Sequence, residues 1–426
     1  MDTIKICVIG LGYVGLPLAR LFSTKYQTVG FDMNQTRVEV LMNGHDTTLE
    51  VSDELLHDAI SNHGFLCTTD LEEIKECNFY VVAVPTPVDT NNRPDLTPLW
   101  NASELVGKVI SKGDIVVYES TVYPGVTEEE CLPVVERVSG LKFNEDFFAG
   151  YSPERINPGD KEHTVEKIKK VTSGSTPEIA DLIDSVYNSV LINGTHKASN
   201  IKVAEASKII ENSQRDVNIA FMNELAKIFN AMGIDTNDVI EAAASKWNFI
   251  KLKPGLVGGH CISVDPYYLI QKAQVYGVLP RVMFAARRLN DGMGDYVGNQ
   301  VIKQMNKKGI LVKNSKILLL GFTFKENCPD VRNTKIIDIY HTLEEYTSNI
   351  TIYDPWANAD KVQHEYGVYL SNSSIEELEG QYDAVVMAVA HKEFLSFDMR
   401  AFLKSKNGVV YDVKGVLNRD YVDGRL

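Results

Sequence analysis

Short apolar runs alternate with helix-like segments through the first two hundred residues of this 426-residue chain. Continuous apolar runs are typical of parallel strands that are buried on both faces of a sheet. A segment with helical spacing, residues 96–110, separates two of these runs. The alternation predicts a βαβ series and therefore a doubly wound α/β sheet. The runs are IKICVIG at 4–10, TVGFD at 28–32, FYVVAVP at 79–85 and DIVVYES at 114–120.

A long segment without proline or glycine follows, from about Asn200 to Met232, and Gly233 ends it. Its length exceeds the 8–20 residues of an ordinary globular helix. We expect one long helix that bridges two domains or lines a subunit interface. Further helical sequence continues to about Lys307, interrupted by the glycine-rich stretch 254–266.

Apolar runs return in the last third of the chain, which indicates a second α/β unit. These runs are KILLLGF at 316–322, ITIYDP at 350–355, YDAVVMAVA at 382–390 and GVVYDV at 408–413. The predicted fold is α/β, with two Rossmann-like doubly wound domains joined by a long central helix and a helical dimerisation region. We place the three domains at 1–198, 199–308 and 309–426.

The charge balance restricts the partners. Lys and Arg number 43 and Asp and Glu number 57, a net charge of −14. Nucleic acids and anionic membranes both favour basic surfaces, so we expect neither as a partner. We see no signal peptide and no apolar run of the roughly 18 residues that span a bilayer, which predicts a cytoplasmic protein without membrane insertion. The six cysteines lack metal-ligand spacing, and most are expected to be small buried side chains.

A glycine pattern, Gly10-Leu-Gly12-Tyr-Val-Gly15, directly follows the first predicted strand and opens a helix. Glycines in this context allow a tight turn and a close approach of the backbone to a pyrophosphate at a helix N-terminus. The second strand ends at Asp32, where a carboxylate accepts hydrogen bonds from a ribose diol and repels a 2′-phosphate. We therefore predict NAD and not NADP, with Arg37 along the adenosine. The alternative is a glycine-rich turn beside a surface aspartate.

A cysteine, Cys261, stands beside glycines in the sequence GGHCISVDPYYL at 258–269, and Asp265 follows four residues later. Glycines next to a thiol leave room for a substrate, so Cys261 is a candidate nucleophile. Two structural alternatives remain open. Asp265 can simply cap a helix whose first residue is Pro266, and Cys261 can be an inert packed thiol.

Polar residues also line one face of the long helix. Lys208, Asn212 and Arg215 stand at positions i, i+4 and i+7. This spacing puts them on a single helical face. They are either a functional cluster or a solvated polar stripe.

Together these motifs resemble the UDP-glucose/GDP-mannose dehydrogenase family over essentially the whole chain. They are GLGYVGLP, VPTP at 84–87, ESTVYPG at 119–125, SPER at 152–155, SKIIEN at 207–212, GGHCISVDPYYL and GFTFKENCPDVRNT at 321–334. YSPERINPGD, KWNF and GLVGGHCI with VDPYYL are similar to the bacterial UDP-N-acetylhexosamine 6-dehydrogenases of capsule, O-antigen and Vi-polysaccharide synthesis.

The resemblance implies a catalytic role for individual residues. Cys261 would attack the C6 aldehyde formed by the first hydride transfer, and a second transfer would give a thioester that water hydrolyses. Lys208 and Asn212 would stabilise the oxygen on C6. Asp265 and Glu154 would handle protons and activate water. Thr121 would position that water or the nicotinamide.

The resemblance also implies which residues bind cofactor and substrate. The N-terminal domain would bind NAD, and the C-terminal domain UDP. The cofactor set is Gly10, Gly12, Tyr13, Val14, Gly15, Asp32, Arg37, Thr86, Thr121 and Arg332. The substrate set is Arg155, Asn157, Lys208, Asn212, Arg215, Gly258 and Lys325.

One position departs from the family pattern. UDP-glucose members usually carry a second glutamate four residues after the first, and here that position is Pro158. Activation of water by a pair of glutamates is therefore in doubt for this chain. Arg155 and Asn157 occupy the same segment and are expected to contact a substrate group such as the N-acetyl.

The predicted function is NAD-dependent, four-electron oxidation of the C6 alcohol of UDP-N-acetylglucosamine or UDP-N-acetylgalactosamine to the uronic acid, for surface polysaccharide synthesis, by a homodimer built on the central helices. The first alternative is a UDP-glucose or UDP-N-acetylmannosamine 6-dehydrogenase. A single-step β-hydroxyacid dehydrogenase is more distant, because it needs no cysteine nucleophile and no second α/β domain. A non-catalytic NAD-binding module is the alternative from another class.

Overall fold

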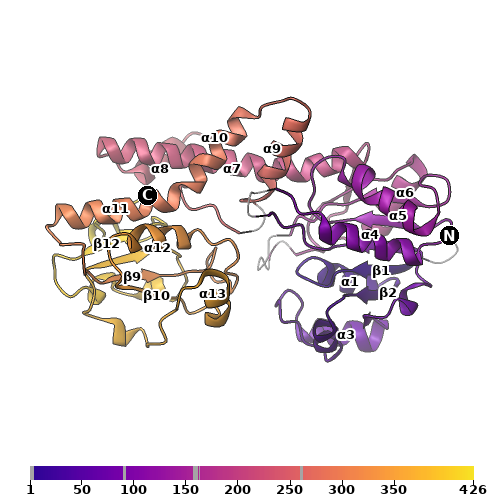
Figure 1. Ribbon diagram of the computed structural model, residues 1–426, viewed down its shortest axis with the longest axis horizontal. Helices are drawn as coiled ribbons and strands as arrows, with labels where there is room; N and C mark the ends of the chain where they lie inside the picture. Colours follow the sequence, from indigo (N-terminus) through magenta and orange to yellow (C-terminus); the bar gives the residue numbers. More distant parts are fainter. Residues whose placement is uncertain (1–3, 90–92, 157–161, 163, 260–261) are drawn as a thin grey trace. The chain divides into compact units, whose positions relative to one another are not determined.

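The computed structural model describes residues 4–89, 93–156, 162, 164–259 and 262–426 (Figure 1). The chain divides into two compact units. Unit 1 comprises Met1–Glu211 with Tyr267–Gly277, and unit 2 comprises Asn212–Pro266 with Val278–Leu426. Helices α7 (Ile201–Met232) and α9 (Asp265–Val275) contribute residues to both units.

Unit 1 alternates strands with helices, as the apolar runs predict. Its strands are β1 (Lys5–Ile9), β2 (Gln27–Phe31), β3 (Leu66–Thr68), β4 (Phe79–Val82), β5 (Ile115–Tyr118), β6 (Phe148–Tyr151), β7 (Lys170–Thr172) and β8 (Thr195–Lys197). Its α-helices are α1 (Gly15–Ser23), α2 (Gln35–Met42), α3 (Asp53–His63), α4 (Thr97–Val109), α5 (Leu132–Ser139) and α6 (Pro177–Asn188). A 3-10 turn, η1 (Glu72–Ile74), precedes β4, and a π-helical turn, η2 (Thr127–Cys131), leads into α5.

The main sheet of unit 1 has the strand order β3-β2-β1-β4-β5-β6, and every pair in it is parallel. This is the order of a dinucleotide-binding sheet, in which the chain reverses direction across the sheet between β1 and β4. The carboxyl ends of all these strands lie along one edge, so the segments that follow them share that edge. β7 and β8 form a separate parallel pair.

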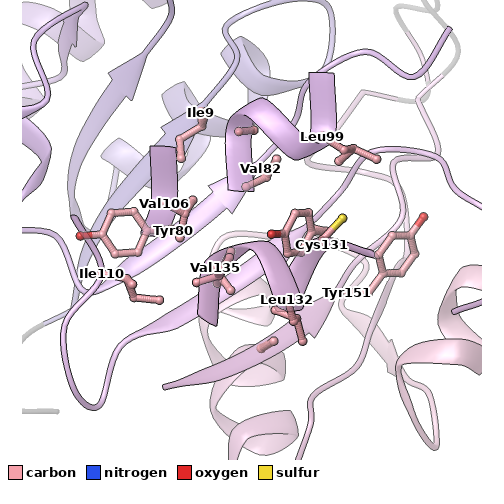
Figure 2. Close-up of a cluster of buried hydrophobic side chains, with 14 of the residues drawn as sticks. Ile9, Tyr80, Val82, Leu99, Val106, Ile110, Cys131, Leu132, Val135 and Tyr151 are labelled. Atoms are coloured by element: carbon pink, nitrogen blue, oxygen red, sulfur yellow. The ribbon is translucent and has the colours of Figure 1, made fainter. Parts of the chain in front are cut away.

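Alternating side chains of each strand build a different core on each face of this sheet. Ile6 and Val8 pack with apolar residues of α1, α2, α3 and α6. Cys7 and Ile9 pack on the opposite face with α4 and α5. Figure 2 shows this second core, in which Tyr80 and Val82 lie among the helical side chains of Leu99 and Val135 and others. The strands are therefore buried on both sides, as their continuous apolar sequences indicate.

Unit 2 is helical first and α/β afterwards. Its helices are α8 (Thr236–Ala244), α10 (Arg281–Asp291), α11 (Met293–Lys307), α12 (Ile336–Glu344) and α13 (Ala359–Tyr366). Its strands are β9 (Ile317–Leu320), β10 (Ile350–Tyr353), β11 (Ala384–Met387), β12 (Val409–Asp412) and β13 (Gly424–Arg425). Short 3-10 segments are η3 (Glu376–Leu378), η4 (Phe394–Ser396), η5 (Met399–Phe402) and η6 (Arg419–Tyr421).

The sheet of unit 2 is also parallel, with the order β10-β9-β11-β12-β13. This is the second common doubly wound order, with its reversal between β9 and β11. Helices α11, α12 and α13 cover one face, where Ile317 and Leu319 are buried. The other face buries Leu318 and Leu320 against η3, η4 and η5, so short 3-10 segments and loops cover it in place of long helices.

The structure confirms the predicted fold class, with two parallel α/β sheets and the long helix α7. No helix of the described chain is both long and apolar enough to cross a membrane. The described residues also hold no cluster of three His, Cys, Asp or Glu side chains suited to a metal ion. Cys7, Cys67, Cys77, Cys131 and Cys328 are free and buried, which confirms their structural interpretation. The three-domain division stays a prediction.

Candidate active site

The glycine-rich turn after β1 is shaped by contact with its neighbours. Gly10 has φ +92°, and a Cβ there would lie 2.8 Å from the Ala83 carbonyl oxygen. A Cβ on Gly15 would lie 1.8 Å from the Gly10 carbonyl oxygen, whereas a Cβ on Gly12 would meet nothing within 4 Å. The first and third glycines are therefore required by the turn itself, and Gly12 leaves open space beside it. Tyr13 and Val14 are partly exposed at the start of α1.

Helix α1 begins in a way that suits an anionic ligand. Val14 caps it without a side-chain hydrogen bond, and its first turn carries no acidic residue. Backbone N–H groups at a helix N-terminus attract negative charge. The turn therefore fits the diphosphate of a dinucleotide.

Asp32, directly after β2, is held by the backbone. One carboxylate oxygen accepts from Leu11 N (2.9 Å) and the other from Asn34 N (2.9 Å). Arg37 donates to the Leu11 carbonyl oxygen and pairs with the buried Asp46 at 2.8 Å. Arg37 thus braces the loops around Asp32, and its prediction as an adenosine contact stays untested.

A cleft of about 330 Å³ lies at this edge of the unit 1 sheet. Asp32 and Met33 line one side, and Val84 and Asn101 are among the residues that line the rest. Because it lies at the carboxyl ends of β1, β2 and β4, it occupies the ligand position of a doubly wound sheet. Thr86 follows on the same loop, where its carbonyl oxygen accepts a hydrogen bond from the Tyr268 hydroxyl.

Thr121 lies in the loop after β5, and a buried glutamate of α7 fixes the end of that loop. The Glu205 carboxylate accepts hydrogen bonds from Gly125 N (2.5 Å) and Thr127 N (2.9 Å). Burial raises the pKa of Glu205 to about 7, and the two N–H donors oppose that rise. Thr121 itself is partly exposed, so its hydroxyl can meet a ligand.

Glu154 lies after β6 and is 95% buried, with 5% of its surface exposed. One carboxylate oxygen accepts from Arg155 N (2.5 Å) and Ile156 N (2.6 Å). The other lies 3.3 Å from Nζ of Lys170. Arg155 pairs with Glu211 at 2.8 Å and donates to the Lys169 carbonyl oxygen. Asn157, like Pro158, falls outside the described residues.

Helix α7 carries the predicted polar face, and its members differ in environment. Lys208 is buried, and it makes no hydrogen bond or ion pair with the described residues. Asn212 is buried and donates to the carboxylate of Asp265. Arg215 is exposed. Lys208 and Asn212 therefore differ from a solvated stripe, whereas Arg215 resembles one.

Asp265 is the first residue of α9 and is buried. Its hydrogen bond from Asn212 joins α7 to the start of α9 within unit 2. The helix therefore begins one residue earlier than the capping alternative predicts, and Asp265 is paired with a second candidate residue, Asn212.

The loop that leads to Cys261 is held tightly up to Gly259. Asn223 of α7 accepts from Gly255 N (2.8 Å) and donates to the Gly255 carbonyl oxygen (3.0 Å). A Cβ on Gly258 would lie 2.7 Å from the Asn333 carbonyl oxygen. Gly258 therefore serves the close packing of this loop on the segment after β9. Cys261 and His260 lie outside the described residues.

Lys325 and Arg332 both belong to that segment. Lys325 Nζ lies 5.5 Å from the centre of the Phe324 ring. Arg332 binds Asp330 through two hydrogen bonds of 2.9 and 2.7 Å. The structure brings both residues to the carboxyl edge of β9, the position of a ligand site in this sheet order.

Sequence reasoning did not single out Glu119, Lys170, Glu205 or Asn223. Glu119 directly follows a buried strand inside the motif ESTVYPG, a position that could have identified it. No local signal marks Lys170, because its partner Glu119 lies 51 residues away.

The sheet order, the open glycine turn and the carboxylate of Asp32 define an NAD-dependent dehydrogenase. Models of the UDP-glucose/GDP-mannose dehydrogenase family match the chain in three parts: the NAD binding domain at residues 4–191, the central domain at 202–292 and the UDP binding domain at 318–419.

Known proteins resemble the chain over its full length. The UDP-N-acetyl-D-glucosamine 6-dehydrogenase of Pseudomonas aeruginosa is 57% identical over 429 residues, 100% of both chains. That of Salmonella typhi is 56% identical, over 100% of this chain and 99% of the relative. The solved structure of the UDP-D-ManNAc dehydrogenase from Pyrococcus horikoshii has a TM-score of 0.89 at 28% identity, covering 99% of this chain and 98% of that one. The chain belongs to the UDP-glucose/GDP-mannose dehydrogenase family.

Asp32 should set the preference for NAD over NADP. Two like charges about 4 Å apart repel by about 4 kcal/mol at an effective dielectric of 20, so we expect kcat/KM for NAD to exceed that for NADP by about a hundredfold or more. Asp32→Asn should reduce this ratio mainly by improving the use of NADP. Glu39→Gln, an exposed carboxylate of α2 outside the cleft lining, is the matched control. Equal use of the two cofactors by the unmodified enzyme would contradict the assignment.

Proposed function

We propose that this enzyme oxidises the C6 alcohol of a UDP-N-acetylhexosamine, UDP-N-acetylglucosamine or its 4-epimer, to the carboxylate for surface polysaccharide synthesis. The observation that carries the proposal is the hydrogen bond from Asn212 to the buried Asp265. It joins the SKIIEN helix to the residue four positions after Cys261, the candidate nucleophile. The two relatives at 57% and 56% identity bear the name of this activity.

The proposed reaction removes two hydrides from one carbon. NAD accepts a hydride from C6 in each oxidation step. The first step also releases the hydroxyl proton and leaves an aldehyde. The Cys261 thiolate then forms a bond to the aldehyde carbon, and the tetrahedral adduct can lose the second hydride to become a thioester. Water hydrolyses the thioester and frees the thiolate.

Lys208 and Asn212 are proposed to stabilise the negative charge that develops on the C6 oxygen. The buried side chain of Lys208 pairs with no carboxylate among the described residues, so its Nζ can interact with such an oxygen. Asn212 donates one amide hydrogen to Asp265, and its second has no partner among the described residues, so we assign it to the substrate. Thr121 and Glu154 are proposed to act on the hydrolytic water.

The choice of sugar is proposed to depend on the segment that holds Arg155, Asn157 and Pro158. The ion pair of Arg155 with Glu211 and its hydrogen bond to Lys169 fix its guanidinium at the start of this segment. Arg155 would therefore contact an N-acetyl group only through the N–H groups that these two interactions leave over. UDP-glucose and UDP-N-acetylmannosamine are the alternative substrates.

Further residues are proposed to bind the substrate and the cofactor, and each domain is proposed to have its own task. Arg215, Gly258 and Lys325 are assigned to the substrate, and Gly10, Gly12, Tyr13, Val14, Gly15, Asp32, Arg37, Thr86, Thr121 and Arg332 to NAD. The domains are assigned to 1–198 for NAD, 199–308 for catalysis and dimerisation, and 309–426 for UDP. The proposed location is the cytoplasm.

A homodimer is proposed because unit 2 exposes large apolar side chains on α7 and beyond. Phe221 and Ile228 are 54% and 46% exposed, and their spacing of seven residues puts them on one helical face. Trp247, which follows α8, is 92% exposed. Aromatic residues are enriched where subunits meet.

A panel of UDP-sugars tests the substrate proposal. A site that hydrogen-bonds an N-acetyl group leaves its own polar atoms unpaired with UDP-glucose, so kcat/KM should be at least about a hundredfold lower for UDP-glucose than for the preferred N-acetylhexosamine. NADH release measured by absorbance gives the ranking. A preference for UDP-glucose would refute the choice of sugar and leave the reaction class intact.

Cys261→Ala should abolish formation of the uronic acid while NAD and UDP-sugar still bind. The second oxidation needs a tetrahedral carbon, and without the thiol only slow hydration of the aldehyde supplies it. Cys328→Ala, a buried thiol of unit 2, is the matched control. Two NADH per sugar from the Cys261 variant at a rate within about tenfold of the parent, or about 1.4 kcal/mol of barrier, would exclude covalent catalysis.

Charges placed on the exposed face of α7 should separate the subunits. Phe221→Glu combined with Ile228→Glu puts two carboxylates into the proposed interface, and sedimentation should then show a monomer. Leu311→Glu alters an apolar residue outside α7 that is 78% exposed, more than either, and should leave the dimer unchanged. A parent protein that sediments as a monomer at micromolar concentration would rule out the dimer.

A further inference from the structure

Three ionisable side chains from separate segments meet inside unit 1. Glu119 follows β5, Lys170 begins β7 and Glu154 follows β6, and their exposed fractions are 0%, 1% and 5%. Lys170 Nζ lies 2.6 Å from a carboxylate oxygen of Glu119 and 3.3 Å from one of Glu154. It also lies 3.3 Å from the Pro153 carbonyl oxygen. One buried ammonium is therefore shared by two buried carboxylates.

The charges of this group do not balance. With both carboxylates ionised it carries a net charge of −1, and an uncompensated buried charge is costly. The described charged or titratable groups that face Glu119 are Lys170 from β7, Glu154 from the segment after β6 and Tyr187 from α6. The Tyr187 hydroxyl donates to the second oxygen of Glu119 at 2.6 Å. Helix α1 contributes the apolar ring of Phe22 against Tyr187.

The surroundings of Glu119 shift its ionisation to a pH near neutrality, where the protein can gain or lose that charge. Burial raises the pKa of Glu119 to about 7, and the charge of Glu154 adds to this rise, whereas Lys170 and Tyr187 oppose it. Burial lowers the pKa of Lys170, but the two carboxylates outweigh that effect and the net shift is upward. Lys170 thus stays charged, and Glu119 changes its charge near pH 7.

The two carboxylates also differ in what holds them. One oxygen of Glu154 is fixed by the two backbone donors of Arg155 and Ile156. The other oxygen of Glu154 pairs with Lys170, whose Nζ lies 3.3 Å from it but 2.6 Å from Glu119. When Glu119 is ionised it competes with Glu154 for the ammonium of Lys170. When Glu119 is protonated, Lys170 interacts more strongly with Glu154.

We propose that Glu119 and Lys170 are positioning residues that act on the reaction through Glu154, by setting how strongly its carboxylate can draw a proton from the hydrolytic water. This proposal rests on the proposed function, in which Glu154 acts on that water. The pair would therefore control the last chemical step and leave the two hydride transfers unchanged.

The step itself is a hydrolysis without oxidation. Glu154 takes one proton from water, and the water oxygen forms a bond to the thioester carbon. The bond from that carbon to the Cys261 sulfur breaks with its electron pair on sulfur. The product carboxylic acid then loses its own proton to solvent.

Glu119→Gln tests the proposal, because it keeps the side-chain volume and fixes the neutral state at every pH. Rapid mixing with saturating NAD and UDP-sugar should show a burst of two NADH per site, followed by a slow phase limited by hydrolysis. In the parent enzyme the hydrolysis rate should rise through about pH 7 as Glu119 ionises. In the variant this rise should be lost, with a fall of about tenfold at pH 8 and little change in the burst or in either KM.

Asp184→Asn is the matched control. Asp184 of α6 accepts a hydrogen bond from Thr172 of β7, so it links the two elements that carry Tyr187 and Lys170, the partners of Glu119. It should retain the parent pH profile. A Glu119→Gln profile that superimposes on the parent, or a burst slowed as much as hydrolysis, would overturn the proposal. A parent enzyme that forms no NADH with any UDP-N-acetylhexosamine would instead refute the proposed function.

Discussion

Parallel pairing of fully buried strands is the constraint on which the rest of the molecule depends. Each strand of β1, β4 and β5 places alternate apolar side chains on opposite faces, so both faces need a covering layer. The covering segments must return the chain to the start of the next parallel strand. All carboxyl ends then fall on one edge, and every segment after a strand is brought to that edge. The glycine turn, Asp32, Thr86, Thr121 and Glu154 follow β1, β2, β4, β5 and β6 for this reason.

The same constraint acts in unit 2 with a different covering. The faces of β9 differ, with α-helices on one side and short 3-10 segments on the other. Because the strand order again reverses beside β9, the segment after it lies at the ligand edge. That segment holds Lys325 and Arg332 and also supports the loop of Gly258. The same segment thus contributes to the proposed nucleotide site and packs against Gly258, three residues before Cys261.

Sequence periodicity could predict the long elements and the local motifs. The apolar runs at 79–85 and 114–120 became β4 and β5, and the segment free of proline and glycine became α7. The strand β6, Phe148–Tyr151, was missed because its sequence FAGY contains no Val, Ile or Thr, the residues that most favour strands in the other apolar runs. Residues whose role depends on distant partners could not be predicted either. Lys170 looks like one of several surface lysines at 167–170 until the fold buries it beside Glu119.

The buried charges of this protein are compensated in different ways. Asp412 and Arg287 have structural roles, and they differ from the group of Glu119, Lys170 and Glu154. Asp412 is buried and satisfied by four backbone N–H groups, from Lys414 to Leu417, so it fixes a turn. Arg287 is buried between two carboxylates, Asp216 and Asp291, but Asp291 is only part-buried and reaches solvent. Backbone N–H groups stabilise the charge of Asp412, and the exposure of Asp291 to solvent screens the excess negative charge of the Arg287 group.

The group of Glu119, Lys170 and Glu154 has no such contact with solvent, since both of its carboxylates are enclosed with one ammonium. One glutamate would have been enough to compensate Lys170, and an apolar pair would fill the space at no electrostatic cost. Stability alone therefore gives no reason for the second carboxylate. A buried excess charge that takes up a proton near neutral pH is the arrangement found where an enzyme needs a tuned base. Glu154 is the member of this group that lies nearest in sequence to Asn157 and Pro158, the positions proposed to affect the choice of sugar.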